Sequence, residues 1–489
     1  MQARISLLVA IAVAIAGTAA AVHYADAGLT LSHYDARAHL VVARRILDSL
    51  TPGWQQIGAV WLPLPHVLNM IPVQIDWSYR TGASGVAISI ASMSVAAWAL
   101  ASLILRTTGS TSGAITGAAL LLLNPNVLYL QSTPMTEPLL FGTTMLSMSL
   151  TAAWIDRGAP GWPKAAGIAI VAACMTRYEA WPITAAIVAL AGIVLLRRGM
   201  PWRDAAVRCV RLSAYPVIAV LVFMANSRWT VGAWFVSGGF FVPENVEALG
   251  HPMAALDQVR EGLHKISGGA LVWSGYAGAA LVCVALVRDR GRASLVLVLS
   301  LAAAAALPWY AYLQGHPFRI RYDVPLVAAC AGLAGAGIGL LWRPARLVLA
   351  AAVIALTTMQ AHPLDRTAPM IVEAQRDAAN MAGRRAVTAF LQQHYDDRTI
   401  MMSMGSLGHY MQDLSAAGFA IHDFLHEGNG EIWRFAMLNP AGMVGWVAIE
   451  ERAEGGDALY EEAHHNARFL AGFERVAEGG GVALYRARR

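Results

Sequence analysis

The sequence predicts a polytopic α-helical membrane protein that ends in a smaller soluble α/β domain. Of the 489 residues, 57% are hydrophobic and only 14% are charged, against about 25% charged in an ordinary soluble domain. Residues 1–360 carry recurrent apolar runs and 24 Lys and Arg against 14 Asp and Glu, whereas residues 361–489 carry 12 against 17. We therefore expect a membrane domain over 1–360 and a soluble domain over 361–489.

The composition also excludes several classes of protein. A water-soluble enzyme and a disordered chain would carry far more charge. A disulfide scaffold is excluded because the four cysteines lie in or beside apolar runs and none lies in the polar tail. No basic stripe with interleaved aromatic residues is present, so nucleic acid is not an expected partner.

Eleven apolar segments approach the length of about 20 residues that a membrane span requires. They are 5–25, 83–105, 112–130, 138–155, 165–181, 182–196, 209–226, 269–287, 293–313, 324–342 and 345–360. The first could also be a cleaved signal peptide, because Arg4 precedes it and Ala19-Ala20-Ala21 resembles a cleavage site. The many later spans favour an uncleaved helix.

The short loops predict the orientation of these spans. One set contains clustered Arg residues and few acids, as cytoplasmic loops do. The opposite set holds most acids of the membrane part and consists of 26–80, 131–137, 177–181, 227–267 and 314–323. We expect a multi-pass protein of a bacterial or archaeal-type cytoplasmic membrane, with a cytoplasmic amino end. The tail and any chemistry are expected on the extracytoplasmic face.

The outer loops and the tail contain recognisable elements. From Ser32 to Leu50, apolar residues recur at helical spacing, which predicts an amphipathic helix on the membrane surface. A second outer element is expected at Trp61–Met70. In the tail we expect strands at 399–404, 419–425, 444–450 and 482–485, and helices at 373–394 and 459–470.

Asp35 and His39 are the first candidates for chemistry. Asp35 lies three residues after Ser32, a spacing that fits a structural capping box at a helix start. A carboxylate just outside the first span can equally meet a lipid-borne substrate. His39 lies four residues further along and shares the helical face of Asp35. For His39 the alternative is a packing histidine.

A second group of charged candidates interrupts apolar segments. Glu137 lies in a short outer loop directly before a span, where a carboxylate is costly to desolvate and indicates function. Its structural alternative is an acid at a helix start, with Pro138 in the first turn. Arg177 and Glu179 break an apolar hairpin, and they could also simply neutralise one another.

Two further arginines oppose the positive-inside trend. Arg319, Arg321 and Tyr322 lie in an outer loop immediately before a span. The planar fork of arginine suits phosphate oxygens, while headgroup anchoring is the alternative. In the tail, Glu427 lies in a polar turn between candidate strands, where turn chemistry alone is a sufficient explanation.

Together these residues resemble the GT-C superfamily of membrane glycosyltransferases. Within it, the sequence is most similar to the protein O-mannosyltransferase and aminoarabinose transferase group, which uses polyprenyl-phosphate sugars. The resemblance covers roughly residues 1–360. It is strongest over Asp35–Pro65, where Ala43-Arg44-Arg45-Ile46-Leu47 is followed by Trp61-Leu62-Pro63-Leu64-Pro65.

The resemblance implies roles for particular residues. Asp35 matches the catalytic carboxylate of the family, and Glu137 resembles the acid after its third span. Arg321 and Tyr322 resemble the late-loop motif that holds the donor phosphate. Many relatives have two adjacent acids in the first loop, whereas here Ala36 follows Asp35.

Whether Glu137 or His39 replaces the missing acid is left open, as is the use of a divalent metal ion; no other cofactor is expected. Arg319 and Arg177 are expected to help Arg321 bind the phosphate, and His39, Glu179 and Glu427 to support the site.

The implied function is inverting transfer of a sugar from a polyprenyl-phosphate donor to an acceptor hydroxyl on a protein, lipid or glycan. Direct displacement at the anomeric carbon needs one base, and the phosphate leaving group needs positive charge. The alternative is a transporter of a lipid or small anionic solute, since acids and arginines near the membrane also mark solute paths. A membrane-anchored scaffold would leave the loop acids unexplained.

Overall fold

The computed structural model describes residues 1–236, 245–453 and 456–488, so part of the expected outer loop 227–267 lies outside the described residues. The chain divides into two compact units. Unit 1 comprises Met1–Ala27, Val86–Asn226 and Phe241–Val372. Unit 2 comprises Gly28–Gly85, Ser227–Phe240 and Glu373–Arg489. This division differs from the expected boundary at residue 360, because the first outer loop packs with the tail rather than with the membrane helices.

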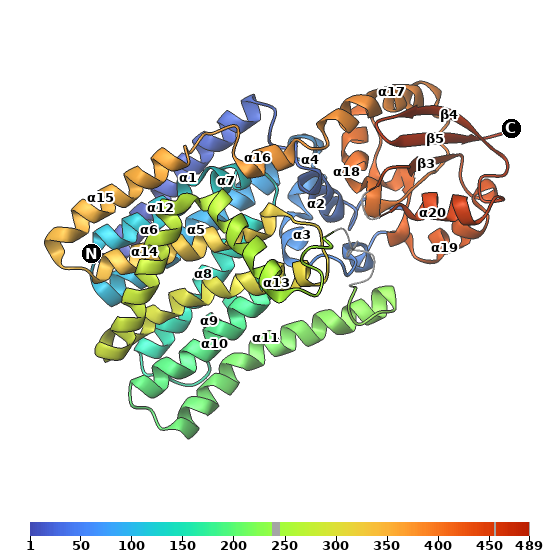
Figure 1. The fold of residues 1–489 in the computed structure, drawn as a ribbon. Coiled ribbons are helices and arrows are strands. Elements are labelled where there is room, and N and C mark those ends of the chain that lie inside the picture. The colour runs from blue at the N-terminus through green and yellow to red at the C-terminus, as the bar shows by residue number, and fades with distance from the viewer. Residues whose placement is uncertain (237–244, 454–455, 489) are drawn as a thin grey trace. The chain divides into compact units, whose positions relative to one another are not determined.

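Unit 1 is a bundle of helices (Figure 1). Its helical elements are α1 (Gln2–Asp26), α5 (Ala83–Thr108), α6 (Thr111–Leu122), α7 (Pro125–Leu130), α8 (Glu137–Asp156), α9 (Lys164–Cys174), α10 (Ala180–Arg197), α11 (Trp202–Val231), α12 (Pro252–Arg288), the 3₁₀ helix η3 (Arg290–Ala305), α13 (Ala306–Leu313), the 3₁₀ helix η4 (Ile320–Asp323), α14 (Val324–Leu340), α15 (Arg343–Gln360) and α16 (Pro369–Ala374).

The predicted polytopic helical class is confirmed. Among the described residues, eight helical stretches are long and apolar enough to cross a membrane. They are α1, α5, α8, α10, α11, α12, Arg290–Leu313 and Ile320–Leu340. The other three predicted spans are also helical, but α6 and α9 have only 12 and 11 residues, and α15 is not among the eight.

Helix α14 forms the centre of unit 1, since every residue from Val324 to Gly339 is buried. Its glycines allow neighbouring backbones to approach closely. A Cβ at Gly335 would lie 2.6 Å from the Cα of Gly117 in α6. A Cβ at Gly278 in α12 would overlap the carbonyl oxygen of Leu333. Small residues at such crossings are the usual means of packing helices inside a membrane.

Unit 2 is an α/β structure built on a five-stranded sheet in the order β2-β1-β3-β5-β4 (Figure 1). Its strands are β1 (Ile400–Met402), β2 (Phe424–Leu425), β3 (Trp446–Glu450), β4 (Phe473–Gly479) and β5 (Val482–Ala487). Strands β2, β1 and β3 are parallel, and β5 is antiparallel to both of its neighbours. The expected soluble α/β domain is therefore present in the tail.

The helices of unit 2 come from both ends of the chain. They are α2 (Tyr34–Arg44), α3 (Leu64–Asn69), α4 (Asp76–Thr81), α17 (Ala378–His394), α18 (Met404–Leu414), α19 (Glu431–Leu438) and α20 (Ala458–His465). One buried cluster joins one face of the sheet to α2, α17 and α18, and a second joins the other face to α19 and α20. The first outer loop thus contributes to the core of the soluble fold.

The sequence analysis missed strand β4 and helices α4, α18 and α19 of unit 2. Strand β4 lies at the edge of the sheet, and only its first residue, Phe473, is buried. It therefore lacks the apolar alternation that marks a strand. Helix α18 begins two residues after β1 and contains Gly405 and Gly408, which lower its helix propensity.

Helix α2 differs from the expected surface helix in three respects. It ends at Arg44 rather than near residue 50. Its apolar face, which includes Leu40 and Val41, is buried in the core of unit 2. Its cap is His33, whose Nδ1 accepts the backbone N–H of Asp35 at 3.1 Å, while the Ser32 hydroxyl donates to the carbonyl of Leu29. The N-cap of α2 is therefore His33 rather than Ser32.

Candidate functional site

A cluster of buried charges lies in unit 1, which we call the Glu137 cluster: Glu137, Arg177, Glu179 and Arg321. Glu137 is the first residue of α8, with Pro138 in the first turn. Arg177 and Glu179 occupy the break between α9 and α10, and Arg321 lies in η4 directly before α14. Each residue therefore lies at a helix start or break, where the polar backbone of the turn tolerates a charged side chain.

The ion pairs of the cluster centre on Arg177. Its Nη1 lies 3.0 Å from Oε1 of Glu137, and its Nη2 lies 2.6 Å from Oε1 of Glu179. Nη1 also donates to Oγ1 of Thr136 at 2.9 Å. Burial disfavours the charged guanidinium, but the two carboxylates outweigh it and raise the pKa of Arg177 above its usual value. Arg177 therefore stays charged.

Glu137 is shared between two arginines. Its side chain is fully buried, and Nε of Arg321 lies 3.8 Å from the same Oε1 that Arg177 approaches. Arg321 thus makes the looser of the two ion pairs. A buried carboxylate needs compensating positive charge, and Glu137 in turn fixes the position of both guanidinium groups.

The segment around Arg321 contacts α13 and is followed by a buried acid. The hydroxyl of Tyr312 in α13 donates to the carbonyl of Arg319 at 2.9 Å. The guanidinium carbon of Arg321 lies 5.8 Å from the centre of the Tyr322 ring. Asp323 is fully buried, and a Cβ at Gly262 of α12 would overlap its carboxylate. The sequence analysis missed Asp323, although its place at the start of an apolar span was a signal.

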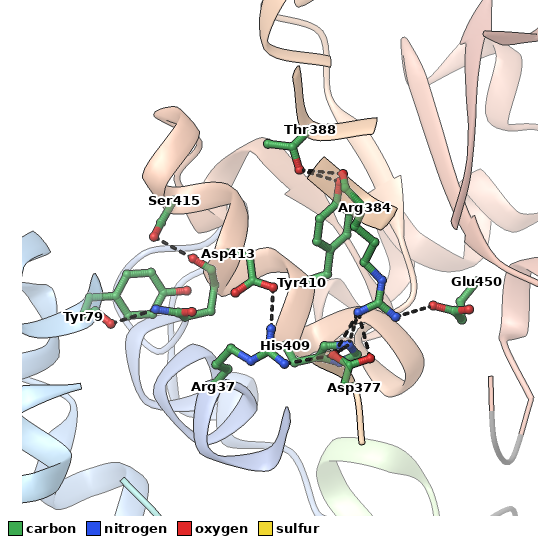
Figure 2. A network of polar contacts seen from close by, with 11 residues as sticks. Arg37, Tyr79, Asp377, Arg384, Thr388, His409, Tyr410, Asp413, Ser415 and Glu450 are labelled. Atoms are coloured by element: carbon green, nitrogen blue, oxygen red, sulfur yellow. Dashed lines mark hydrogen bonds and ion pairs between the residues drawn. The ribbon is translucent and has the colours of Figure 1, made fainter. Parts of the chain in front are cut away.

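In unit 2, Asp35 is the second residue of α2 and its side chain is 9% exposed. The next residue but one, Arg37, is only 1% exposed and anchors the helix (Figure 2). Its Nη2 lies 2.9 Å from Oδ2 of Asp377, and its Nη1 lies 2.5 Å from Oδ2 of Asp413. These ion pairs join α2 to the segment before α17 and to α18.

The same network includes His409 and Arg384 (Figure 2). Nη1 of Arg384 lies 2.7 Å from Nε2 of His409. Nη2 of Arg384 lies 2.8 Å from Oε2 of Glu450 in β3. Burial and the charges of Arg37 and Arg384 lower the pKa of His409 to about 3, against the opposing charges of Asp377 and Asp35. His409 is therefore neutral and accepts the Arg384 hydrogen bond.

His39, two residues after Arg37 in α2, belongs to a group of aromatic rings with Trp61 and His66. Its Nδ1 lies 3.1 Å from Nε2 of His66, and its ring centre lies 4.1 Å from that of Trp61. His66 is 1% exposed, and burial together with the charge of Arg45 lowers its pKa to about 3. The two imidazoles therefore share one hydrogen, which fixes the tautomer of each ring relative to the other.

Glu427 has a structural position in unit 2. Its carboxylate accepts the hydroxyl hydrogen of Ser403 and, at 2.7 Å, the backbone N–H of Met404 at the start of α18. Burial raises the pKa of Glu427 despite these hydrogen bonds. The neighbouring Gly428 accepts a hydrogen bond from Gln56 at 2.9 Å. Glu427 thus stabilises the first turn of α18.

The structure therefore brings some of the sequence candidates together. Glu137, Arg177, Glu179 and Arg321 form one cluster in unit 1, and Asp35 and His39 share α2 in unit 2. Arg37 and His66 were missed, because a lone arginine or histidine in an amphipathic segment carries no sequence signal of its partners. Within the described ranges, no three His, Cys, Asp or Glu side chains are grouped so that they could hold a metal ion.

The fold is similar to that of known membrane proteins. Two crystal structures of ArnT from Cupriavidus metallidurans, one bound to undecaprenyl phosphate and one in the apo state, each match with a TM-score of 0.56. Each match covers 96% of this chain and 97% of ArnT at 13% sequence identity. No protein-family model and no curated protein sequence matches the chain. The chain is thus a polytopic α-helical membrane protein with an ArnT-like fold.

Proposed function

We propose that this protein is an inverting glycosyltransferase that uses a polyprenyl-phosphate sugar as donor. The observation that carries the proposal is the Glu137 cluster, in which two buried acids hold two arginines at helix starts of an ArnT-like fold. ArnT from Cupriavidus metallidurans was solved with undecaprenyl phosphate bound. That ligand combines a long apolar chain with a phosphate, which suits a membrane protein that carries largely buried arginines.

The proposed reaction is a single displacement. An acceptor hydroxyl on a protein, lipid or glycan attacks the anomeric carbon of the sugar. A new carbon–oxygen bond forms as the bond to the phosphate oxygen breaks, and the configuration inverts. The electron pair leaves with the polyprenyl phosphate, and Asp35 takes the hydroxyl proton as general base. Asp35 is the residue that matches the catalytic carboxylate of the family that the sequence resembles. It lies on α2, which the ion pairs of Arg37 anchor.

The arginines provide the other half of the proposed chemistry. As the bond breaks, negative charge accumulates on the leaving phosphate, and a preorganised guanidinium stabilises it. Arg321 supplies this charge in our proposal, assisted by Arg319 and Tyr322. The guanidinium of Arg177 already pairs with Glu137 and Glu179. Its contribution is therefore to hold Glu137, which in turn orients Arg321.

The remaining candidates act in support. In this proposal Glu179 completes the charge balance around Arg177, and His39 provides a hydrogen-bonding nitrogen near Asp35 on α2. Glu427 maintains the start of α18. The reaction takes place on the extracytoplasmic face of a cytoplasmic membrane, because the acid-bearing loops belong to the set opposite the arginine-rich ones.

A transporter of a lipid or small anionic solute is the second candidate, favoured by the same buried ion pairs. Mass spectrometry of lipid-linked sugars and surface glycans, with and without the protein, separates the two. A transferase predicts loss of one glycan together with accumulation of its polyprenyl-phosphate donor. Unchanged glycans would contradict the transferase. Purified protein that moves the anion across vesicle membranes without forming a glycosidic bond would establish transport instead.

A further inference from the structure

A second concentration of arginines lies in unit 1, around a cavity of about 520 Å³. The cavity is lined by Arg106, Thr107, Asp156, Arg198, Arg290 and Gly291. These residues come from the end of α5, the end of α8, the residue after α10 and the start of η3. None of them belongs to the site proposed above.

The cavity and the Glu137 cluster lie at opposite ends of the same helices. Helix α8 begins with Glu137 and ends with Asp156. Helix α10 begins directly after Glu179 and ends directly before Arg198. A helix of 20 residues, the length of α8, is about 30 Å long, which is the thickness of the hydrocarbon core of a bilayer. The cavity is therefore separated from the Glu137 cluster by about the length of α8.

The arginines of the cavity outnumber their acidic partners. Oδ2 of Asp156 lies 2.9 Å from Nε of Arg106, and Oδ1 lies 2.5 Å from Nη2 of Arg198. Asp156 is the only carboxylate in the lining, against three guanidinium groups. Arg290 is exposed, and in the part of the chain that the structure describes no carboxylate lies within 4.0 Å of it. The cavity thus has an excess of positive charge.

The arrangement of these charges selects a ligand class. Asp156 fixes Arg106 and Arg198, and Arg106 also donates to the carbonyl of Ser149 at 3.0 Å, so two guanidinium groups are held in place before any ligand binds. Fixed guanidinium forks match the oxygens of a phosphate group. At the end of a membrane bundle, basic pockets between helices bind phosphate-bearing lipid headgroups.

We infer that this cavity is a phosphate-binding site, filled by the phosphate of an anionic phospholipid or by free phosphate. Arg290 and Arg198 contact the phosphate, and Arg106 keeps Asp156 in position. An anion here neutralises the excess charge and links α5, α8, α10 and η3 at their common end. The site stabilises the bundle and does not depend on the proposed transferase activity.

The test compares Arg290→Gln with a matched control, Arg343→Gln. Arg290 and Arg343 are both exposed arginines, but Arg343 does not line the cavity. The full-length protein is purified in detergent and titrated with phosphatidylglycerol, phosphatidylcholine or inorganic phosphate. Binding is measured by native mass spectrometry and by the shift of the melting temperature, which rises when a ligand binds only the folded state.

We expect phosphatidylglycerol to bind and to stabilise the wild type more strongly than phosphatidylcholine. Arg290→Gln should weaken this binding roughly tenfold, since a charge-assisted contact is lost, whereas Arg343→Gln should match the wild type. Equal stabilisation by inorganic phosphate identifies free phosphate as the ligand; no effect of inorganic phosphate identifies the lipid headgroup. Indistinguishable binding by Arg290→Gln and Arg343→Gln overturns the inference. Equal binding of both lipids together with no stabilisation by inorganic phosphate overturns it as well.

Discussion

Asp35 shows how a single position can combine a structural and a chemical explanation. The cap of α2 is His33, whose side chain accepts the backbone N–H of Asp35 rather than contacting its carboxylate. Asparagine keeps the shape of aspartate and the helix start, but it cannot accept a proton. The substitution therefore separates the two explanations.

We expect Asp35→Asn to remain folded, with a free energy of unfolding lower by about 1 kcal/mol or less. Its transfer rate should fall by about 100-fold or more. The measurements are melting temperature and transfer rate of the purified protein. The companion variant His33→Ala removes the cap and should be less stable but active. Near-normal transfer by folded Asp35→Asn would exclude it as the base and direct the search to Glu137.

Arg321 offers a test of phosphate binding at the same scale. Lysine preserves the charge of arginine but is a point charge that cannot make a two-pronged contact. We expect Arg321→Ala to weaken donor use and Arg321→Lys to restore little of it. Both variants should fold, because Arg177 still pairs with Glu137. The measurement is transfer rate against donor concentration. If both variants transfer normally at low donor concentration, Arg321 only anchors the loop.

His409 predicts a pH dependence of stability in unit 2. Its pKa is lowered to about 3 in the folded protein from an ordinary value of 6.5. Between these values the unfolded chain binds more protons than the folded one, so this contribution to stability falls as the pH decreases from 6.5 toward 3. The slope is at most about 1.4 kcal/mol per pH unit.

The variant His409→Gln tests this dependence, because glutamine can still accept from Arg384 but does not titrate. We expect its melting temperature to fall less steeply than that of the wild type between pH 7 and pH 5. Parallel curves for the two proteins would show that His409 does not set the slope.

At the scale of elements, α2 is the link between the first outer loop and the tail. The sequence predicted the helix from its apolar spacing, and a period of that kind identifies the element but not its partner. Its ion pairs join residues separated by 340 and 376 positions in the sequence, Arg37 with Asp377 and Arg37 with Asp413. Nothing local to α2 indicates these pairings, which is why they emerged only from the structure.

The ion pairs of Arg37 predict that substituting Arg37 and substituting Asp413 destabilise unit 2 by different amounts. Arg37 is 1% exposed, whereas Asp413 is 28% exposed at its side chain and Asp377 remains as a second partner. We expect Arg37→Ala to destabilise unit 2 by about 3–5 kcal/mol, since two carboxylates lose their shared cation, and Asp413→Ala to cost clearly less. Denaturation of both variants and of the double variant measures the coupling. Equal costs for the two single variants would contradict this account.

At the scale of the whole molecule, the sequence predicted best those features that depend only on neighbouring residues in the chain. Apolar length and composition predicted helices at all eleven expected positions, including the break that places Arg177 and Glu179. The grouping of Glu137, Arg177 and Arg321 was not predictable from those lengths, because it depends on which helix starts become neighbours. Likewise, the edge strand β4 and the membership of 28–85 in unit 2 depend on tertiary packing.

Topology is the last prediction and applies to the entire chain. Arginine-rich loops alternate with acid-bearing loops, so the positive-inside rule puts the tail outside the cytoplasm. One reporter is active only when it lies outside the cytoplasm. We expect it to be active when fused after Arg489 and silent when inserted after Arg106. A cytoplasmic reporter should give the reverse pattern at both positions. Activity of the Arg489 fusion only inside would place Asp35 and the whole acid-bearing set on the cytoplasmic face, where the proposed extracytoplasmic transfer cannot occur.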